Sequence, residues 1–167
     1  MSKYRRPHGQ YVRETADWFI DRRMAGGAYS GVVAGKFASV SLYNDATDGS
    51  VLHVIGATGN TFISPDTVDL YTHKGVLGTV VAGATTPITP FLTTLWGKIY
   101  TSSDAAATSD MGIWTLGLVN APQPWPYNFP LCVLAPGFSL LCQGSTAGAD
   151  VDMLFHWLVM GSAQGYY

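Results

Sequence analysis

Few residues in this chain of 167 residues are of a type and spacing suited to catalysis. Its histidines are His8, His53, His73 and His156, and no two share a metal-ligand spacing with each other or with a cysteine. No serine lies in a G-x-S-x-G sequence, and no glycine-rich phosphate loop precedes a helix. His53 and His156 lie inside apolar segments, where a histidine satisfied by its neighbours is more typical than a ligand. We therefore expect a protein that is not an enzyme and holds no metal or cofactor.

The carboxylates are also poorly placed for acid–base chemistry. Glu14 is the sole glutamate, so a hydrolase with paired carboxylates would depend on aspartates in turns. Asp45 and Asp48, like Asp66 and Asp69, stand in sequences where aspartate commonly bonds the backbone of a turn. A loop that binds calcium remains an alternative, although carboxylates are few.

The two cysteines, Cys132 and Cys142, fall in segments that we predict to be neighbouring strands. Two cysteines in a chain of this length do not make a disulfide framework. Buried free thiols behave as small hydrophobic side chains. We expect both thiols to be reduced and buried, and a disulfide between them is the alternative.

The N-terminal segment is basic and aromatic, which sets it apart from the rest of the chain. All five arginines and Lys3 precede residue 24, against three acidic residues, whereas the remaining chain has three lysines and eight aspartates. A positive arm on a negative body is suited to docking. Arginine forks would reach carboxylates of a partner, and aromatic rings would anchor the arm. The predicted partner-binding residues are Lys3, Tyr4, Arg5, Arg6, Tyr11, Arg13, Trp18, Phe19, Arg22 and Arg23.

Two other interpretations of the arm stay open. It could neutralise phosphates of a nucleic acid, but its small net charge makes a nucleic acid an unexpected partner. It could also pack on the body of its own chain. No apolar run is long enough to span a membrane, and the basic start is not followed by the apolar stretch of a secretory signal, so we expect no membrane partner.

The composition points to a surface that partners cover. Hydrophobic residues make up 47% of the chain and charged residues only 12%, about half of the usual charged share. A surface with so little charge favours burial against other molecules. The alternative is a neutral surface rich in threonine, serine and asparagine.

The predicted elements divide the chain into a docking arm, residues 1–30, and a β-sandwich domain, residues 31–167. In the arm, Pro7 and Gly9 favour extended chain, and residues 15–24 could form a short helix that ends at Gly26 and Gly27. From residue 31, β-branched and aromatic residues alternate with turn clusters. Strands are predicted within 37–43, 51–55, 67–71, 78–81, 91–100, 113–117, 131–134, 138–142 and 151–160. Residues 101–110 are predicted as a loop, and 121–126 as an exposed polyproline stretch.

This pattern predicts an all-β fold, a jelly-roll-like two-sheet antiparallel β-sandwich with an extended N-terminal arm. A barrel or an immunoglobulin-like sandwich is the alternative.

The C-terminal third resembles a pattern in small virion proteins of tailed bacteriophages. There a Pro-Gly turn, here Pro136–Gly137, opens an apolar strand, a small-residue turn follows, and a final strand ends in an aromatic-x-Trp pair, here Phe155 and Trp157. The segments 42–45 and 51–55 resemble the early strand pair of the same proteins. The resemblance covers about a third of the chain, and its motifs are structural rather than catalytic.

The resemblance implies a jelly-roll structural protein of the virion, of the capsid decoration or cement type. Its implied partner is the major capsid protein or another virion protein, and its implied assembly is a homotrimer. Its implied location is the capsid surface, after assembly in the cytoplasm of the host bacterium. The alternatives are a trimeric receptor-binding domain of a fibre or tail spike that binds carbohydrate, and a free carbohydrate-binding module of an enzyme or cell-surface protein.

Overall fold

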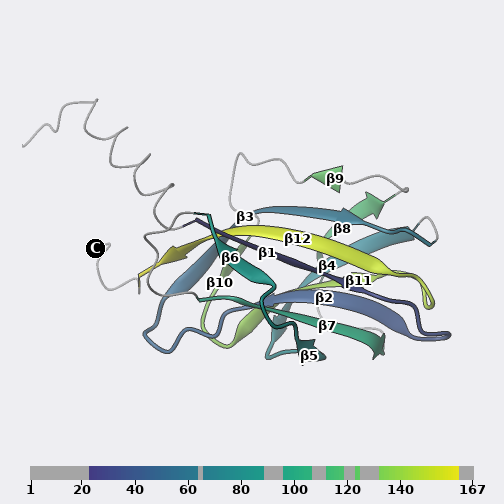
Figure 1. Ribbon diagram of the computed structural model, residues 1–167, viewed down its shortest axis with the longest axis horizontal. Helices are drawn as coiled ribbons and strands as arrows, with labels where there is room; N and C mark the ends of the chain where they lie inside the picture. Colours follow the sequence, from purple (N-terminus) through teal and green to yellow (C-terminus); the bar gives the residue numbers. More distant parts are fainter. Residues whose placement is uncertain are drawn as a thin grey trace, which may run out of the picture.

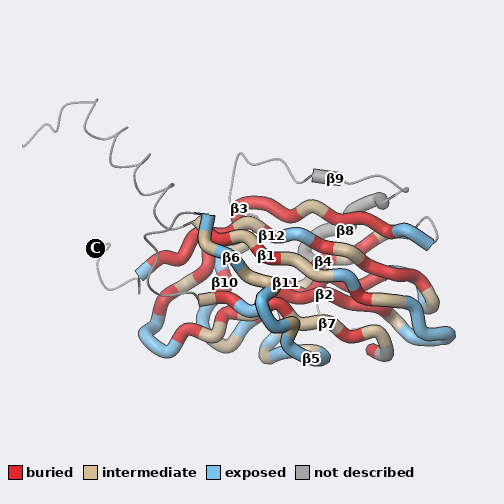
Figure 2. Tube along the Cα trace, viewed as in Figure 1, coloured by how far each residue is buried: buried red, intermediate tan, exposed pale blue. Residues whose placement is uncertain are grey.

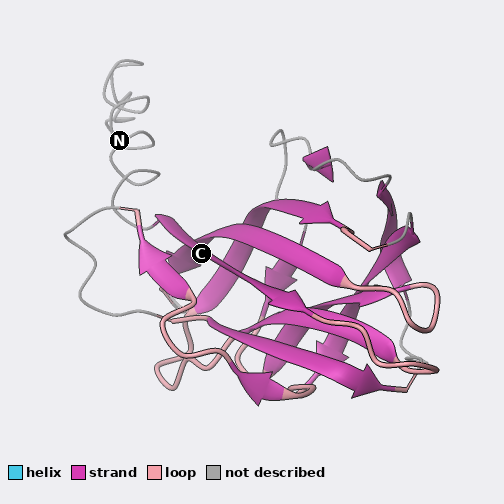
Figure 3. Cartoon of the chain, turned by 45° about the vertical axis from the view of Figure 1, so that its right-hand side comes forward, coloured by secondary structure: helices cyan, strands magenta, loops and turns pink. Residues whose placement is uncertain are grey.

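The computed structural model describes residues 23–63, 66–88, 96–106, 112–118, 123–124 and 132–161, which form two antiparallel β-sheets packed face to face (Figure 1). The connections between strands gather at the two ends of this sandwich (Figure 3). Residues 1–22 of the predicted arm lie outside the described residues.

Each sheet contains six described strands. The first sheet has the order β10 (Cys132–Leu134), β3 (Val51–Asn60), β12 (Val151–Met160), β1 (Arg23–Ser30) and β6 (Thr85–Pro87), and β9 (Gln123–Pro124) also pairs with β3. The second sheet has the order β5 (Thr79–Val80), β7 (Lys98–Ala105), β2 (Phe37–Tyr43), β11 (Phe138–Gly144), β4 (Asp66–Lys74) and β8 (Gly112–Leu118).

The connectivity is that of a jelly roll, which confirms the predicted fold class. Strands β1, β12, β3 and β10 lie side by side in the first sheet, and β2, β11, β4 and β8 lie side by side in the second. The chain alternates between the sheets from β1 to β4 and again from β8 to β12, except that β9 and β10 both join the first sheet. This order gives two interleaved Greek keys. Strands β5, β6 and β7 are inserted between β4 and β8, and they extend the sheets beyond β1 and β2.

One apolar core fills the space between the sheets (Figure 2). The inner strands β12 and β2 contribute alternate residues to it, namely Val151, Met153, Phe155, Trp157, Ala38, Val40 and Leu42. Trp157 is fully buried, and its indole Nε1 donates a hydrogen bond to the carbonyl oxygen of Trp96 over 3.0 Å. A buried tryptophan needs such a partner for its N–H group, so this hydrogen bond as well as packing fixes the position of the ring.

The predicted boundary between arm and sandwich at residue 30 is wrong, because residues 23–30 form β1 between β12 and β6. The helix predicted for residues 15–24 is wrong at Arg23 and Met24, and its remainder lies outside the described residues. The sequence predicted that Gly26 and Gly27 end a helix. In the structure they instead lie within β1, where the absence of a side chain lets the backbones of Ala84 and Met153 come close. A Cβ atom on Gly26 would lie 2.7 Å from the carbonyl oxygen of Ala84, and one on Gly27 would collide with that of Met153.

Two further predictions change between residues 101 and 126. The loop predicted for 101–110 is wrong over residues 101–105, which continue β7 and pair with β2. Of the predicted polyproline stretch, Gln123 and Pro124 form β9 and pair with β3, while its other residues lie outside the described ranges.

Candidate binding surface

Of the ten predicted partner-binding residues, only Arg23 belongs to the described part of the chain. It opens β1 opposite Leu158 of β12, and its Nη2 atom lies 3.4 Å from Nδ1 of His156. Its Nε atom is buried without a hydrogen-bond partner in the described structure. Arg23 is therefore half-buried on the outer face of the first sheet and is not part of a free arm. The other nine predicted residues lie outside the described ranges.

The two predicted strand histidines lie in strands of the first sheet. His53 of β3 and His156 of β12 are half-buried. Burial lowers the pKa of His53, and burial together with the nearby charge of Arg23 lowers the pKa of His156. Across the described ranges, no cluster of histidine, cysteine, aspartate or glutamate side chains could hold a metal ion. The same ranges contain no helix long and apolar enough to cross a membrane.

The two cysteines are free thiols, as predicted. Cys142 is fully buried, whereas Cys132 is only partly buried against the core. They do not lie in neighbouring strands of one sheet, because β10 pairs with β3 and β11 pairs with β2 and β4. Burial raises the pKa of Cys132 to about 12 and that of Cys142 well above its ordinary value. Both sulfurs therefore stay protonated at neutral pH, which makes them inert as nucleophiles.

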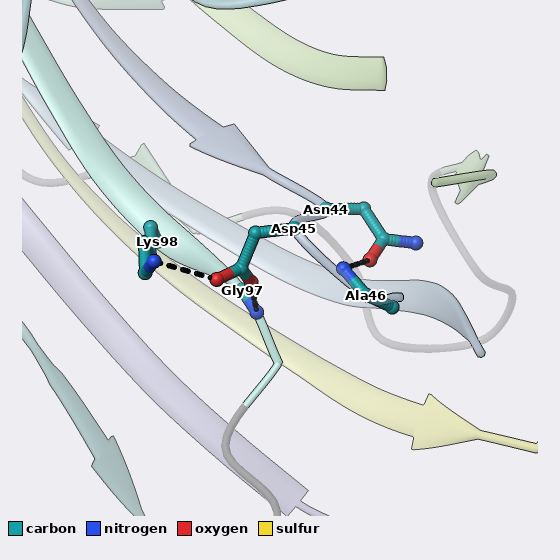
Figure 4. A network of polar contacts seen from close by, with 5 residues as sticks. All are labelled: Asn44, Asp45, Ala46, Gly97 and Lys98. Atoms are coloured by element: carbon teal, nitrogen blue, oxygen red, sulfur yellow. Dashed lines mark hydrogen bonds and ion pairs between the residues drawn. The ribbon is translucent and has the colours of Figure 1, made fainter. Parts of the chain in front are cut away.

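A polar network ties together the connections at the end of the sandwich where β2 finishes. Asn44 is fully buried, and its amide nitrogen donates to the carbonyl oxygens of Ser50 (2.9 Å) and Leu134 (2.8 Å). Its amide oxygen accepts from the backbone N–H of Ala46 over 3.0 Å (Figure 4). Asn44 thus joins the β2–β3 connection to the end of β10, as a buried polar group must find partners inside the protein.

The two aspartates that follow Asn44 hold neighbouring groups in the same network. Asp45 accepts from the backbone N–H of Gly97 at 2.9 Å and pairs with the ammonium group of Lys98 at 2.9 Å (Figure 4). Asp48 accepts from the backbone N–H of Ser50 and from the indole nitrogen of Trp96. The contact between Asp48 and Ser50 is the turn-forming role that the sequence predicted, whereas Asp45 instead joins this connection to the start of β7. Together these contacts engage the carboxylate oxygens that a calcium loop would need.

The opposite end of the sandwich exposes apolar side chains instead. Strands β1 and β3 are both antiparallel to β12, so both finish at the end where β12 begins. The exposed segments there are visible at the right of Figure 2. We call the five large hydrophobic residues that β1 and the connections after β1 and β3 expose the end patch, namely Tyr29, Val32, Val33, Phe62 and Ile63. Phe62 and Ile63 are 60% and 64% exposed, which is unusual for side chains of their type.

A buried carboxylate holds part of the end patch in place. Asp150 is fully buried, and its oxygens accept the backbone N–H groups of Phe62 (2.9 Å) and Ile63 (3.0 Å). The rings of Tyr29 and Phe62 meet at a tilt of 55°, with centroids 6.0 Å apart. Desolvation, followed by the charge and hydrogen bond of Asp150, raises the pKa of Tyr29, so its phenol stays neutral. The same carboxylate therefore holds the backbone that carries Phe62 and lies near the phenol of Tyr29.

A hollow of about 550 Å³ lies beside the end patch, between β1, the β4–β5 connection and β7. Its lining includes Tyr29 and Val33 of the end patch and the hydroxyl-bearing residues Ser30, Thr79, Thr101 and Ser103. The hydroxyl of Ser30 donates to the carbonyl oxygen of Ser102 over 2.7 Å, which links the two sheets at the floor of the hollow.

Sequence reasoning missed this surface because its residues come from three separate places in the chain. Tyr29 was assigned to the arm, and Phe62 and Ile63 fell between predicted strands. One signal was available, since Phe62 and Ile63 stand among turn-forming residues from Gly59 to Pro65, where large apolar side chains are unexpected.

The end patch and its supporting residues suit binding better than catalysis. They bring together aromatic, aliphatic and carboxylate side chains, and they include no histidine, cysteine or other base next to a nucleophile. An exposed apolar surface with a fixed conformation is typical of a site of protein contact. Comparisons with known proteins add no relative, because no protein-family model, no curated protein and no solved structure matches this chain.

Proposed function

We propose that the protein is a non-enzymatic structural component of a virion, a decoration or cement protein that attaches to the major capsid protein or to another virion protein. The observation that carries the proposal is the end patch, in which the buried Asp150 carboxylate holds Phe62 and Ile63 exposed to solvent. Exposed apolar residues of this size lower solubility unless a partner covers them. Because the protein holds the backbone of Phe62 and Ile63 in place and leaves their side chains exposed, they are evidence of a contact surface.

The jelly-roll connectivity supports the same proposal. Viral capsid proteins are one of the groups that use this fold, together with lectins and other binding proteins, so the fold by itself carries no function. The residues that resemble virion proteins fall in β2 and β11 of the second sheet and in β3 and β12 of the first, and these strands lie in the middle of the two sheets. A cement protein bridges neighbouring capsomers, and many copies make a modest interface sufficient.

The basic segment before β1 is the second proposed attachment. Residues 3–22 carry four arginines, one lysine and the aromatic residues Tyr4, Tyr11, Trp18 and Phe19. A segment of this composition suits an acidic groove on a partner, with charge-assisted contacts at its rim. Arg23 is left out of this attachment, because it belongs to β1 and lies beside His156.

The test is the copy number of the protein on particles assembled with variants. Replacing Phe62 and Ile63 by serine should lower occupancy, and deleting residues 1–22 should lower it further. The matched control replaces Val76 and Ile88 by serine, since both are exposed apolar residues that lie away from the end patch. Full occupancy by a protein that carries both the serine replacements and the deletion would overturn the proposal.

A receptor-binding domain of a fibre or tail spike is the second candidate, and the hollow beside the end patch is the observation that favours it. Both candidates are expected to form a homotrimer, which light scattering on the purified protein would detect. Electron microscopy of particles labelled on this protein separates the two, because the label falls on the head in one case and on a fibre or tail in the other.

A further inference from the structure

We infer that the end patch of one copy of this protein binds the basic segment, residues 3–22, of a second copy. The inference rests on the proposed function, which treats both as contact surfaces, and it names the partner that each of them meets. The contact is head to tail, because each copy contributes a different surface to it. Three such contacts in a ring close the homotrimer that the proposed function expects.

Two carboxylates give the end patch a negative charge. Asp152 lies opposite Tyr29 in the register of β1 and β12, and the hydroxyl of Tyr29 bonds to Asp150. Asp150 is fully buried and already accepts the backbone N–H groups of Phe62 and Ile63. The half-buried Asp152 is therefore the carboxylate that a cation of a partner reaches.

The surroundings of Asp152 favour the approach of a cation. Burial raises the pKa of Asp152, and the nearby charge of Asp150 raises it further. Both effects make the ionised form of Asp152 less stable than it is in water. A guanidinium group beside this carboxylate offsets the burial and the like charge together, so an ion pair gains more here than between two fully exposed groups.

Apolar side chains flank this carboxylate on both sides. Asp152 stands between Tyr29 of β1 and Asn60 of β3, and Asn60 precedes Phe62 by two residues. Phe62 and Ile63 are exposed, while Asp150 holds their backbone in place. Residues whose backbone is already ordered lose little conformational entropy when a partner packs against them. The partner that fits the end patch therefore carries both cationic and large apolar side chains.

The basic segment of the same chain has this combination. It holds four arginines and one lysine against three acidic residues, together with the aromatic residues Tyr4, Tyr11, Trp18 and Phe19. Arginine matches the geometry of a carboxylate, and aromatic rings pack well against other apolar side chains. The rest of the chain has three lysines against eight aspartates, so the basic segment of one copy is also attracted to the body of another at longer range.

Strand β1 separates the two surfaces within one copy. It begins at Arg23 opposite Leu158 and ends at Ser30 opposite Val151, so the basic segment joins the sandwich at the end away from the end patch (Figure 1). A strand of this length spans about 23 Å. Docking on its own end patch requires the segment to run back along all of β1, whereas docking on a neighbouring copy does not.

The first experiment measures the mass of the isolated full chain by light scattering after gel filtration. We expect the mass of a trimer. Replacing Phe62 and Ile63 by serine, the patch variant, or Trp18 and Phe19 by serine, the segment variant, should each reduce it to the mass of a monomer. A rise in salt from about 0.1 M to about 1 M shortens the reach of charge attraction from about 10 Å to about 3 Å, so it should also weaken the trimer.

The second experiment mixes the two variants, since each keeps one of the two surfaces. Unlabelled patch variant, which has an intact basic segment, is added to ¹⁵N-labelled segment variant, which has an intact end patch. We expect the amide signals of Phe62, Ile63 and Asp152 to shift. Adding more unlabelled segment variant instead should leave these signals unchanged, because neither protein then carries an intact segment.

The matched control replaces Val76 and Ile88 by serine, which removes exposed apolar side chains elsewhere and should leave a trimer. The inference is overturned if the full chain is a monomer at every concentration, if the segment variant still forms a trimer, or if the mixture produces no shift. The segment variant and the mixture keep the test decisive even if the patch variant folds poorly, because the labelled protein has an unchanged sandwich.

Failure of this inference is distinguishable from failure of the proposed function. The masses and the amide shifts are measured on isolated protein, whereas the proposed function is tested by occupancy on particles. A monomeric protein that still occupies particles overturns the inference alone. A trimer that assembles head to tail but never attaches to particles overturns the proposed function alone.

Discussion

At the scale of single residues, two buried polar side chains organise the two ends of the sandwich. Asn44 satisfies three backbone groups at one end, and Asp150 satisfies two at the other. Neither side chain is exposed to solvent, so each is a structural part of its loop rather than a reactive group. The cost of removing either is set by the backbone groups left without partners.

Asn44→Ala should strongly destabilise the protein. The substitution leaves the carbonyl oxygens of Ser50 and Leu134 and the N–H of Ala46 without their partner, and we expect a loss of about 2–4 kcal/mol in the free energy of unfolding. Urea denaturation measures this value. The control is Thr47→Ala, an exposed position in the same connection, which should change stability by less than about 0.5 kcal/mol. Equal effects of the two substitutions would contradict the role of Asn44.

His53 and His156 should make the protein less stable in mild acid. Burial lowers the pKa of both in the folded state, so below their ordinary value of 6.5 the unfolded chain binds more protons than the folded chain. Stability is therefore fully present above pH 6.5 and falls as the pH drops below it. Denaturation at pH 8 and pH 5.5 measures the difference. The double variant His53→Gln, His156→Gln should show a smaller loss, and an unchanged loss would contradict the assignment.

At the scale of elements, β1 shows that residues 23–30 belong to the sandwich and not to an N-terminal arm. Two glycines and two alanines in eight residues are poor strand formers, yet β1 pairs along its whole length with β12. Small side chains are needed because β6 and β12 approach its backbone closely from both sides. The connection after β3 is a second element that depends on tertiary contact, as Asp150 comes from a turn 87 or 88 residues later in the chain.

Asp150→Asn should release the connection after β3 while leaving the sheets intact. The amide can present only one acceptor oxygen, and its NH₂ group would face an N–H donor that the carboxylate now accepts. Hydrogen exchange should accelerate at the amides of Phe62 and Ile63, and the core amides of β12 should remain protected. The control is Asp152→Asn, a half-buried neighbour, since the amides of Phe62 and Ile63 donate to Asp150 instead. Unchanged hydrogen exchange at residues 62 and 63 would contradict the proposed role of Asp150 in holding this connection.

At the scale of the whole molecule, the boundary of the folded body follows from the jelly-roll order. Strand β1 stands between β12 and β6 and carries Met24, a fully buried member of the core. A truncation that spares residue 23 keeps every described strand. A truncation at the sequence-predicted boundary of residue 30 removes one strand of the first sheet.

Deletion of residues 1–22 should leave a protein that unfolds cooperatively, and deletion of residues 1–30 should not. The longer deletion exposes the edge of β12 and removes Met24 from the core, which together exceed the margin of stability of an ordinary domain. Calorimetry and near-ultraviolet circular dichroism measure both proteins. A cooperative transition in the longer deletion would show that β1 is dispensable.

The sequence by itself determined the fold class and the roles of several isolated residues. Alternation of apolar and polar residues in segments such as 37–43 and 151–160 reports which face is buried, and that information is local. The free thiols, the strand positions of His53 and His156 and the turn-forming role of Asp48 were predicted for the same reason. Composition also set an N-terminal segment apart from the rest of the chain, but the predicted boundary at residue 30 lay within the sandwich.

Only the tertiary structure decided where the sandwich begins and that the end patch is the candidate binding surface. The glycines of β1 have no local strand preference, and they become a strand because β6 and β12 satisfy their backbone groups. Tyr29, Phe62 and Asp150 are distant in sequence and meet because β1, β3 and β12 share one end of the first sheet. Contacts of this kind arise from strand pairing over long separations, which no local pattern of residues encodes.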